Sequence, residues 1–293
     1  MVSAQTQPKY EVQGGSLIPP ELEASFPKLF QLRNDELGRD AVRLMNDRFK
    51  GSDYATLNIS GLREGQPIGY SNPYRRWAVG PIVRELLGND IELLTPALSE
   101  QALRNGKLPD VASTYEDLGV VVYRLKGPNN KLVQHLVSQA KEIGVEVKFP
   151  MVFYHLKTVK DDKFPDGLRF DLDDIAVAYH VPILLQNTGN FDANDPQLVK
   201  SGFPSKLGKG SRTLYTAQDD LGRLYRNRGL NLEADSGNLP DSYEAGRVSF
   251  VKKGTAPQIL EEKLAELGAE KKRQIAEVEA RYGKALKIMS GNR

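Results

Sequence analysis

The chain has 293 residues, no cysteine and nearly balanced charge, with 40 Lys and Arg against 38 Asp and Glu. The lack of cysteine excludes disulfides, thiol catalysis, zinc fingers and iron–sulfur clusters, and a net charge of +2 does not favour a nucleic-acid partner. A hydrophobic content of 40% is enough to bury the core of one large domain or two ordinary ones.

The first part of the chain predicts a flexible arm followed by an α-rich region. Residues 1–20 are rich in Gln, Gly, Ser and Pro and lack the pattern of a signal peptide. Residues 21–114 form the predicted N-terminal α-rich region, with Asn34 or Asp35 as a helix N-cap and Pro81 in the first turn of a later helix. The predicted helices span 21–49, 78–87 and 99–105.

Residues 115–254 change in pattern and predict a second, sheet-containing domain. A continuous β-branched run at 118–123 indicates a buried strand, and residues 129–143 have helical spacing that stops at Gly144. We expect a further strand at 149–156. A closing strand at 247–251 is expected to pair with the Val120 region or with 149–156. The predicted fold class is α+β.

Residues 255–293 predict a long C-terminal helix. Apolar residues recur between positions 257 and 289 with Glu, Lys and Arg between them, which is the pattern of an amphipathic helix. Such a helix needs a partner, so this part predicts oligomerisation or docking to another protein. No apolar run approaches the roughly 18 residues of a membrane span. We expect a protein of the cytoplasm, or one associated with a particle or cell surface.

Two classes of residue alternate in the segment 221–248. Apolar residues are spaced so that they can all face one core, and Tyr, Asn, Asp and Ser lie between them. Tyr offers a large contact area at low entropic cost, and Asn, Ser and Gly offer adaptable hydrogen bonds, as in antibody paratopes. Composition alone fits a recognition surface and an ordinary polar loop held by leucines equally well. The apolar set is Leu221, Leu224, Leu230, Leu232, Ala234, Leu239 and Val248.

The same segment resembles the variable region of diversity-generating retroelement variable proteins. The resemblance is carried by GSRTLYT (210–216), LGRLYR (221–226), LNLEA (230–234), LPDS (239–242) and GRV (246–248). It implies a C-type lectin fold whose static scaffold displays side chains altered by an adenine-error-prone reverse transcriptase. It also implies a non-catalytic protein without cofactor that binds a macromolecule, most simply another protein. The ligand-contacting positions would be Tyr225, Asn227, Asn231, Asp235, Ser236, Asn238, Asp241 and Tyr243.

The chain departs from the family pattern in two ways. The variable region of the family usually ends the chain, whereas here 255–293 follow it. Glu233, Glu244 and the arginines are not products of Asn-type codons, so we assign them to the scaffold. No Glu-Pro-Asn or Gln-Pro-Asp tripeptide is present, and calcium-dependent sugar binding is not implied.

Two other functions remain open from the sequence. Asp110, Glu146 and Lys148 carry the letters of a metal-dependent PD-ExK nuclease, in which two carboxylates hold a divalent ion and the lysine steadies the attacking water. Alternatively, the chain is an assembly protein that works through its C-terminal helix. The glycine-rich run Gly208-Lys-Gly210 lacks the spacing of a phosphate-binding P-loop, and the three histidines have no metal-ligand spacing.

Overall fold

The computed structural model describes residues 12–13, 16–17, 28–106, 114–217 and 220–252. The chain divides into two compact units, Met1–Lys252 and Lys253–Arg293, and every described residue belongs to the first. Most of the predicted arm, Asp110 and the predicted C-terminal helix lie outside the described residues.

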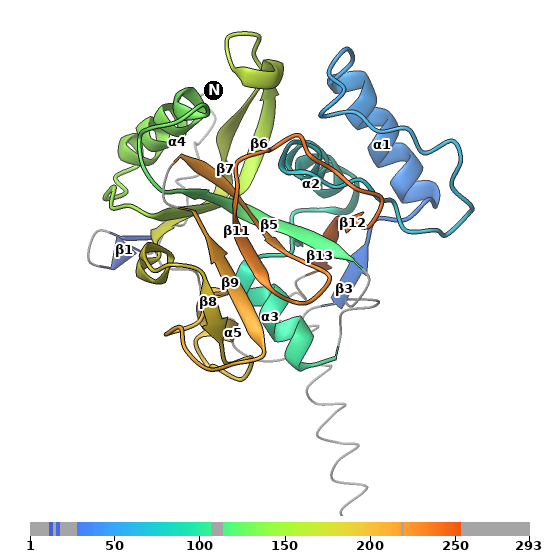
Figure 1. Cartoon of the computed structure of the whole chain (residues 1–293). Coiled ribbons are helices and arrows are strands. Elements are labelled where there is room, and N and C mark those ends of the chain that lie inside the picture. The colour runs from blue at the N-terminus through green and yellow to red at the C-terminus, as the bar shows by residue number, and fades with distance from the viewer. Residues whose placement is uncertain (1–11, 14–15, 18–27, 107–113, 218–219, 253–293) are drawn as a thin grey trace, which may run out of the picture. The chain divides into compact units, whose positions relative to one another are not determined.

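The first unit is a mixture of helices and sheets, which fits the predicted α+β class (Figure 1). Its helices are α1 (Glu36–Arg48), α2 (Pro73–Leu87), α3 (Pro96–Arg104), α4 (Asn130–Glu142) and α5 (Leu198–Ser201), with 3-10 turns η2 (Pro165–Gly167) and η3 (Pro182–Leu185). The main sheet contains β5 (Tyr115–Val122), β6 (Met151–Lys160), β7 (Leu168–His180), β8 (Gly189–Phe191), β9 (Arg212–Thr216), β10 (Leu221–Arg226), β11 (Leu232–Ser236) and β12 (Gly246–Arg247). A small sheet contains β3 (Lys28–Gln31), β4 (Ile91–Leu93) and β13 (Ser249–Lys252), and β1 (Val12–Gln13) pairs with β2 (Ser16–Leu17).

The strands of the main sheet run in the order β7-β6-β5-β10-β11-β9-β8, and β12 lies beside β5. Neighbouring strands are antiparallel except for the pairs β11–β9 and β12–β5, which are parallel. The small sheet has the order β3-β13-β4. Strand β10 therefore lies in the middle of the main sheet, between β5 and β11.

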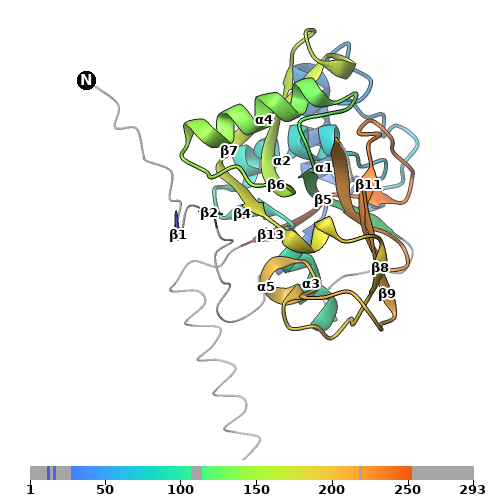
Figure 2. The same cartoon turned by 60° about the vertical axis from the view of Figure 1, so that its left-hand side comes forward.

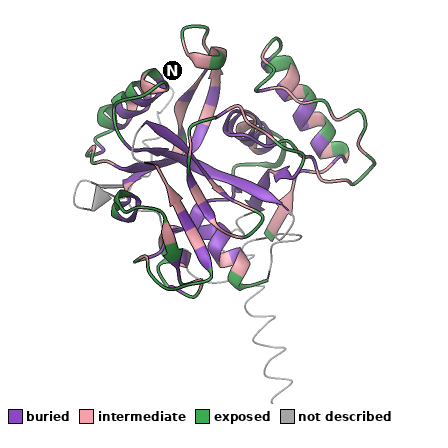
Figure 3. Cartoon of the chain, viewed as in Figure 1, coloured by how far each residue is buried: buried purple, intermediate pink, exposed green. Residues whose placement is uncertain are grey.

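The main sheet separates two hydrophobic clusters. The first joins α1, α2 and α4 to β5, β6 and β7, and the second joins α3 and the α5 region to β5, β9, β10 and β11. Figure 2 shows α4 and α2 on one side of the sheet, and α3 and α5 on the other. Because both faces are covered, Val120, Val121 and Val122 of β5 are all fully buried, as the β-branched run predicts. In Figure 3 the central strands are mainly buried, and exposure concentrates in the loops and on the outward sides of helices.

Several predicted helices are confirmed, and their starts are explained by side-chain caps. Asp35 caps α1, since its Oδ1 accepts a hydrogen bond from the backbone N–H of Gly38 at 2.9 Å. Helix α4 buries Leu132, Leu136 and Ala140 along one face, as amphipathic spacing requires, and Gly144 follows its end with φ of 84°.

Other boundaries differ from the prediction. Helix α2 begins at Pro73, where Asn72 accepts a hydrogen bond from the N–H of Arg75 at 2.8 Å. Pro81 therefore lies inside the helix and not in its first turn. Helix α3 begins at Pro96 with Thr95 as its cap, ahead of the predicted start at Ser99. Residues 28–31 form a strand where helix was predicted, because they pair with β13.

The strand pairing of residues 246–252 differs in part from the prediction. Gly246 and Arg247 pair with Tyr115 and Glu116 at the start of β5. Strand β13, however, pairs with β3 and β4, and not with the Val120 region or with 149–156. The elements of 21–114 and 115–254 therefore pack as parts of the same compact unit.

Candidate recognition surface

The structure separates the two residue classes of 221–248 by burial. Six of the seven apolar residues are buried, and Leu230 alone is half-buried, with φ of 65°. None of the eight predicted ligand-contacting side chains is buried: Asp235, Asn238 and Tyr243 are exposed and the other five are half-buried. We call these eight positions the display surface. They lie on β10, on β11 and on the loops that follow each strand.

Strand β10 places its side chains alternately on the two faces of the sheet. Leu224 belongs to the cluster that contains α3, and Arg226 donates a hydrogen bond to Ser99 of α3. Arg223 and Tyr225 therefore lie on the opposite face. Tyr225 pairs with Glu233 of β11 on one side and with β5 on the other.

Glu233 connects two positions of the display surface. The phenol of Tyr225 donates to Glu233 Oε2, and Asn227 Nδ2 donates to Glu233 Oε1. Burial, followed by the hydrogen bond and the negative charge of Glu233, raises the pKa of Tyr225 well above its ordinary value. The phenol therefore remains a neutral hydrogen-bond donor at neutral pH. The prediction assigned Glu233 to the scaffold, but its carboxylate lies among the displayed side chains.

The tyrosines of the display surface contact a buried tyrosine. The ring of Tyr115 lies 5.9 Å from that of Tyr225 and 6.3 Å from that of Tyr243, centroid to centroid, and both pairs are edge-on. Tyr115 is anchored because its hydroxyl donates to the carbonyl of Ser71 at 2.7 Å and accepts from the N–H of Tyr243 at 2.9 Å. Burial and the charge of Asp117 raise the pKa of Tyr115 to about 12. Edge-on pairs of this kind add roughly 0.5–1.5 kcal/mol beyond area burial.

A buried ion pair lies beneath these rings. Arg223 Nε donates to Asp117 Oδ1 at 2.9 Å, and Ser71 Oγ donates to Asp117 Oδ2 at 2.9 Å. The guanidinium also donates to the carbonyl of Asp241 at 2.6 Å and lies 5.1 Å from the ring centroid of Tyr225, within cation–π range. Arg223 and Asp117 are both buried. They hold β10, β5 and the loop after β11 together.

The preceding residue, Glu116, forms a second buried ion pair. Its carboxylate accepts hydrogen bonds from Arg76 of α2 and from the hydroxyl of Ser249 of β13. Burial raises the pKa of Glu116, and the neighbouring Arg76 opposes that shift. Arg76 and Trp77 are both buried, so these two side chains of α2 pack inside the protein.

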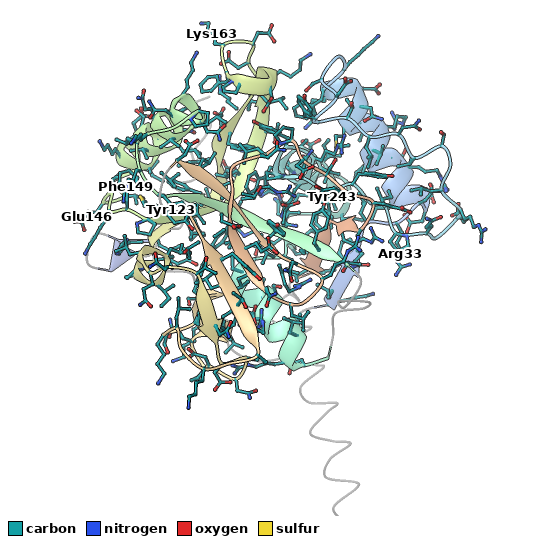
Figure 4. The ribbon with its side chains drawn as sticks, in the orientation of Figure 1. Arg33, Tyr123, Glu146, Phe149, Lys163 and Tyr243 are labelled. Carbon is teal, nitrogen blue, oxygen red and sulfur yellow. The ribbon has the colours of Figure 1, made fainter. Side chains whose placement is uncertain are left out.

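Hydrogen bonds from residues at the start of α2 connect the loop after β11 to the N-terminal part of the chain. Arg75 Nη1 donates to the carbonyl of Tyr70 and to Ser242 Oγ, each at 2.9 Å. Its Nε and Nη2 donate to carbonyls of the segment 53–56, and Asn72 Nδ2 donates to the carbonyl of Pro240 at 3.2 Å. The loop that contains Tyr243, which Figure 4 labels, is therefore held by Arg75 and Asn72 at the start of α2.

Two further tyrosines lie on segments joined to this loop. Tyr54 and Tyr70 are 41% and 44% exposed, against 58% for Tyr243, so all three rings are available to a partner. The N–H of Tyr70 donates to the carbonyl of Tyr243 at 3.0 Å. The prediction did not include Tyr54 and Tyr70 among the ligand-contacting positions, because they lie about 170 to 180 residues before the loop that follows β11.

The eight predicted positions are not equally free to change. Asn227 Oδ1 accepts from the N–H groups of Gly229 and Asn231, at 2.8 and 3.0 Å. Asn231 Oδ1 accepts from the N–H of Thr213 at 2.8 Å. These two amides stabilise the turn between β10 and β11, and Tyr225 is bonded to Glu233. The side chains of the remaining five positions are exposed or half-buried and do not stabilise this turn. These positions are Asp235, Ser236, Asn238, Asp241 and Tyr243.

The residues of the other predicted sites lie apart from the display surface. Glu146 and Lys148 are exposed in the irregular segment between α4 and β6 (Figure 4 labels Glu146), and Asp110 lies outside the described residues. His135 Nε2 lies 2.7 Å from Asp171 Oδ1, and His180 Nδ1 lies 3.1 Å from the carbonyl of Pro150. Within the described ranges, His, Asp and Glu side chains form no group of three that could hold a metal ion.

None of the helices in the part of the chain that the structure describes combines the length and the apolar character needed to cross a bilayer. No family model, curated protein or solved structure matches this chain.

Proposed function

We propose that the chain is a non-catalytic binding protein that presents the display surface to a macromolecular ligand on a C-type-lectin-like scaffold, as the retroelement resemblance implies. The observation that supports it is the burial pattern of 221–248. Leucines with 0–1% exposure fix the backbone, and the polar side chains between them remain half-buried or exposed. A surface built this way can change its side chains without losing its core.

The composition of the display surface favours a protein ligand. Tyr225 and Tyr243 supply rigid aromatic area, and aromatic anchors at interfaces often contribute about 2 kcal/mol or more each. Asp235, Asp241 and Glu233 add negative charge, and the nearby Arg223 is already paired with Asp117. A phosphate backbone would be repelled by such a surface.

The neighbouring tyrosines extend the area available to the ligand. Tyr54 and Tyr70 are placed by Arg75 and by the hydrogen bond to the Tyr243 carbonyl. They lie outside 221–248 and would be common to every variant of the display surface. A ligand would therefore meet both constant and variable tyrosines.

A library experiment tests this proposal. The eight positions of the display surface are varied among Tyr, Asn, Asp, Ser and Gly in the full chain, displayed, and selected against purified streptavidin. We expect specific binders that still unfold cooperatively, because the varied side chains lie outside the core. Members that replace Asn227 and Asn231 should melt several degrees lower than the parent, because they lose the hydrogen bonds of the turn.

A matched library controls for exposure alone. It varies eight exposed positions on α1 and α4 with the same residues: Glu36, Arg39, Arg43, Asp47, Gln134, Ser138, Lys141 and Glu142. Binders drawn equally often from both libraries would contradict the proposal, as would widespread unfolding of the first library.

A further inference from the structure

A hollow of about 390 Å³ opens in the chain segment that connects β8 to β9. Its lining comes from two parts of that segment, 192–200 and 205–209. The segment lies at the lower end of the molecule in Figure 2, beside α5, β8 and β9. The volume falls within the roughly 300–1,000 Å³ of small-molecule sites. We call it the lysine hollow, because Lys200, Lys206 and Lys209 all line it.

Within the part of the chain that the structure describes, no carboxylate contacts the three ammonium groups. No carboxylate of the described residues lies within ion-pair distance of Lys200, Lys206 or Lys209. Like charges around one space raise its potential, and each is worth about 1 kcal/mol to a partner at 4 Å even in bulk water. All three lysines are exposed. With Asp192 and Asp195 the lining carries three positive and two negative side chains, a net charge of +1, so an anion that enters is favoured.

The two carboxylates of the lining are engaged by the segment itself. Asp195 Oδ2 accepts from the N–H and the hydroxyl of Ser205, at 2.6 and 2.7 Å, and its Oδ1 accepts from the N–H of Gln197 at 2.8 Å. Burial opposes ionisation of Asp195, but these hydrogen bonds lower its pKa. Asp192 Oδ1 accepts from the N–H of Asn194 at 2.9 Å. Both carboxylates therefore stabilise the segment without touching the lysines.

The frame of the hollow is fixed by backbone contacts. Asp195 joins its two halves through Ser205. The N–H of Gly208 donates to the carbonyl of Asn190 on β8 at 2.7 Å. At Gly210, a Cβ would lie 1.8 Å from the carbonyl oxygen of Phe191, so only glycine allows this approach. Gly210 therefore keeps the chain that follows Lys209 close to β8, whereas at Gly208 a side chain would meet no atom within 4 Å.

We propose that the lysine hollow binds a small polyanion that carries two or more phosphate groups. Lysine binds phosphate as a point charge without a fixed orientation, and three such charges around one space suit a ligand with several charged groups better than a single phosphate. The site is separate from the display surface, which is built on β10 and β11. It stands or falls independently of the proposed function.

Calorimetry on the full chain tests this site. Phosphate, pyrophosphate and tripolyphosphate are titrated at 50 mM NaCl, and we expect one site per chain with affinity rising along that series. The triple variant Lys200→Gln, Lys206→Gln, Lys209→Gln should weaken tripolyphosphate binding at least tenfold. The triple Lys→Arg variant should retain it, because the charge is kept.

A second triple variant of equal net charge serves as the control. Lys126, Lys141 and Lys148 are exposed lysines elsewhere, and their replacement by Gln should leave tripolyphosphate affinity within about twofold if binding is local and not a response to overall charge. Equal losses in both triple variants, or the absence of saturable tripolyphosphate binding by the parent, would overturn the proposal. Unchanged melting temperatures show that the variants remain folded.

Discussion

The buried and the displayed polar groups of this protein behave as opposites. At the start of β5, Glu116 and Asp117 are 0–1% exposed and each is held by an arginine from a distant part of the chain. On the display surface, Asp235 and Tyr243 face solvent. Buried charges are costly to leave without a partner, whereas exposed ones can be exchanged at little cost. A polar residue is therefore not replaceable merely because it is polar. Its burial determines how much stability is lost when it is replaced.

The largest expected effect comes from removing one buried partner. Asp117→Ala leaves the buried guanidinium of Arg223 without its carboxylate, so we expect the free energy of unfolding to fall by about 3–5 kcal/mol. Denaturant unfolding measures it. In the double variant Asp117→Leu, Arg223→Met no unpaired charge remains. Its loss of unfolding free energy should be smaller than the sum of the losses in the single variants Asp117→Leu and Arg223→Met. Additive losses would show that the two groups are not coupled.

An intermediate effect is expected at the turn between β10 and β11. Asn227→Ala removes the acceptor for two backbone N–H groups, and Asn231→Ala removes the acceptor for the N–H of Thr213. Each change should lower the free energy of unfolding by about 1 kcal/mol. Asn227→Asp keeps the acceptor but replaces the amide donor to Glu233 with a second carboxylate, so it should be no milder than Asn227→Ala. A result for Asn227→Ala as small as for Asn238→Ala would remove the distinction drawn among the eight positions.

The loosest positions should show almost no effect on stability. We expect Ser236→Tyr, Asn238→Tyr and Tyr243→Phe each to change the free energy of unfolding by at most about 0.5 kcal/mol, since these side chains are exposed or half-buried and Phe keeps the ring contact with Tyr115. Thermal melting of the three variants beside Leu232→Ala provides the scale, because deletion of that buried side chain should cost about 2–5 kcal/mol. Losses at the three sites approaching that of Leu232→Ala would mean that they belong to the core.

The smallest expected effect is a change in pH dependence. Burial, with the charge of Glu233 adding to it, raises the pKa of Asp235 above its ordinary 3.8, so the fold favours the neutral acid. That stabilisation is complete below the ordinary value and is lost as pH rises through the raised one. Asp235→Asn should therefore melt slightly higher than the parent at pH 7 and equally at pH 3. A parent that melts higher than the variant at pH 7 would reverse the sign of this argument.

The sequence predicts those helices and strands that are determined by residues close together in the chain. The β-branched run of β5, the amphipathic spacing of α4 and the cap at Asp35 each contain their own signal within about a dozen residues. The alternation within 221–248 likewise pointed to buried leucines before any coordinates. Alternation indicates which residues can face a core, and the sheet supplies that core.

The features that escaped prediction depend on partners far along the chain. Arg76 and Glu116 are 40 residues apart, and Asp117 and Arg223 are 106 apart. Strand β3 exists because β13 pairs with it across more than 200 residues. A single sequence does not show such pairings. For the same reason Glu233 was assigned to the scaffold, although its carboxylate bonds two displayed side chains.

The contacts of Arg75 have a consequence for how this protein could evolve. Three of its four acceptors are main-chain carbonyl oxygens, at Asp53, Thr56 and Tyr70, and only Ser242 offers a side chain. Every amino acid has that oxygen. Natural selection could therefore change the side chains at 53 and 56 while Arg75 keeps its hydrogen bonds, so that lineages with different residues there could share one loop geometry. At 70 the choice is narrower, because the backbone is left-handed, with φ of 62°. Arg75 would then be expected to stay constant, whereas the residues whose carbonyl oxygens it contacts could change.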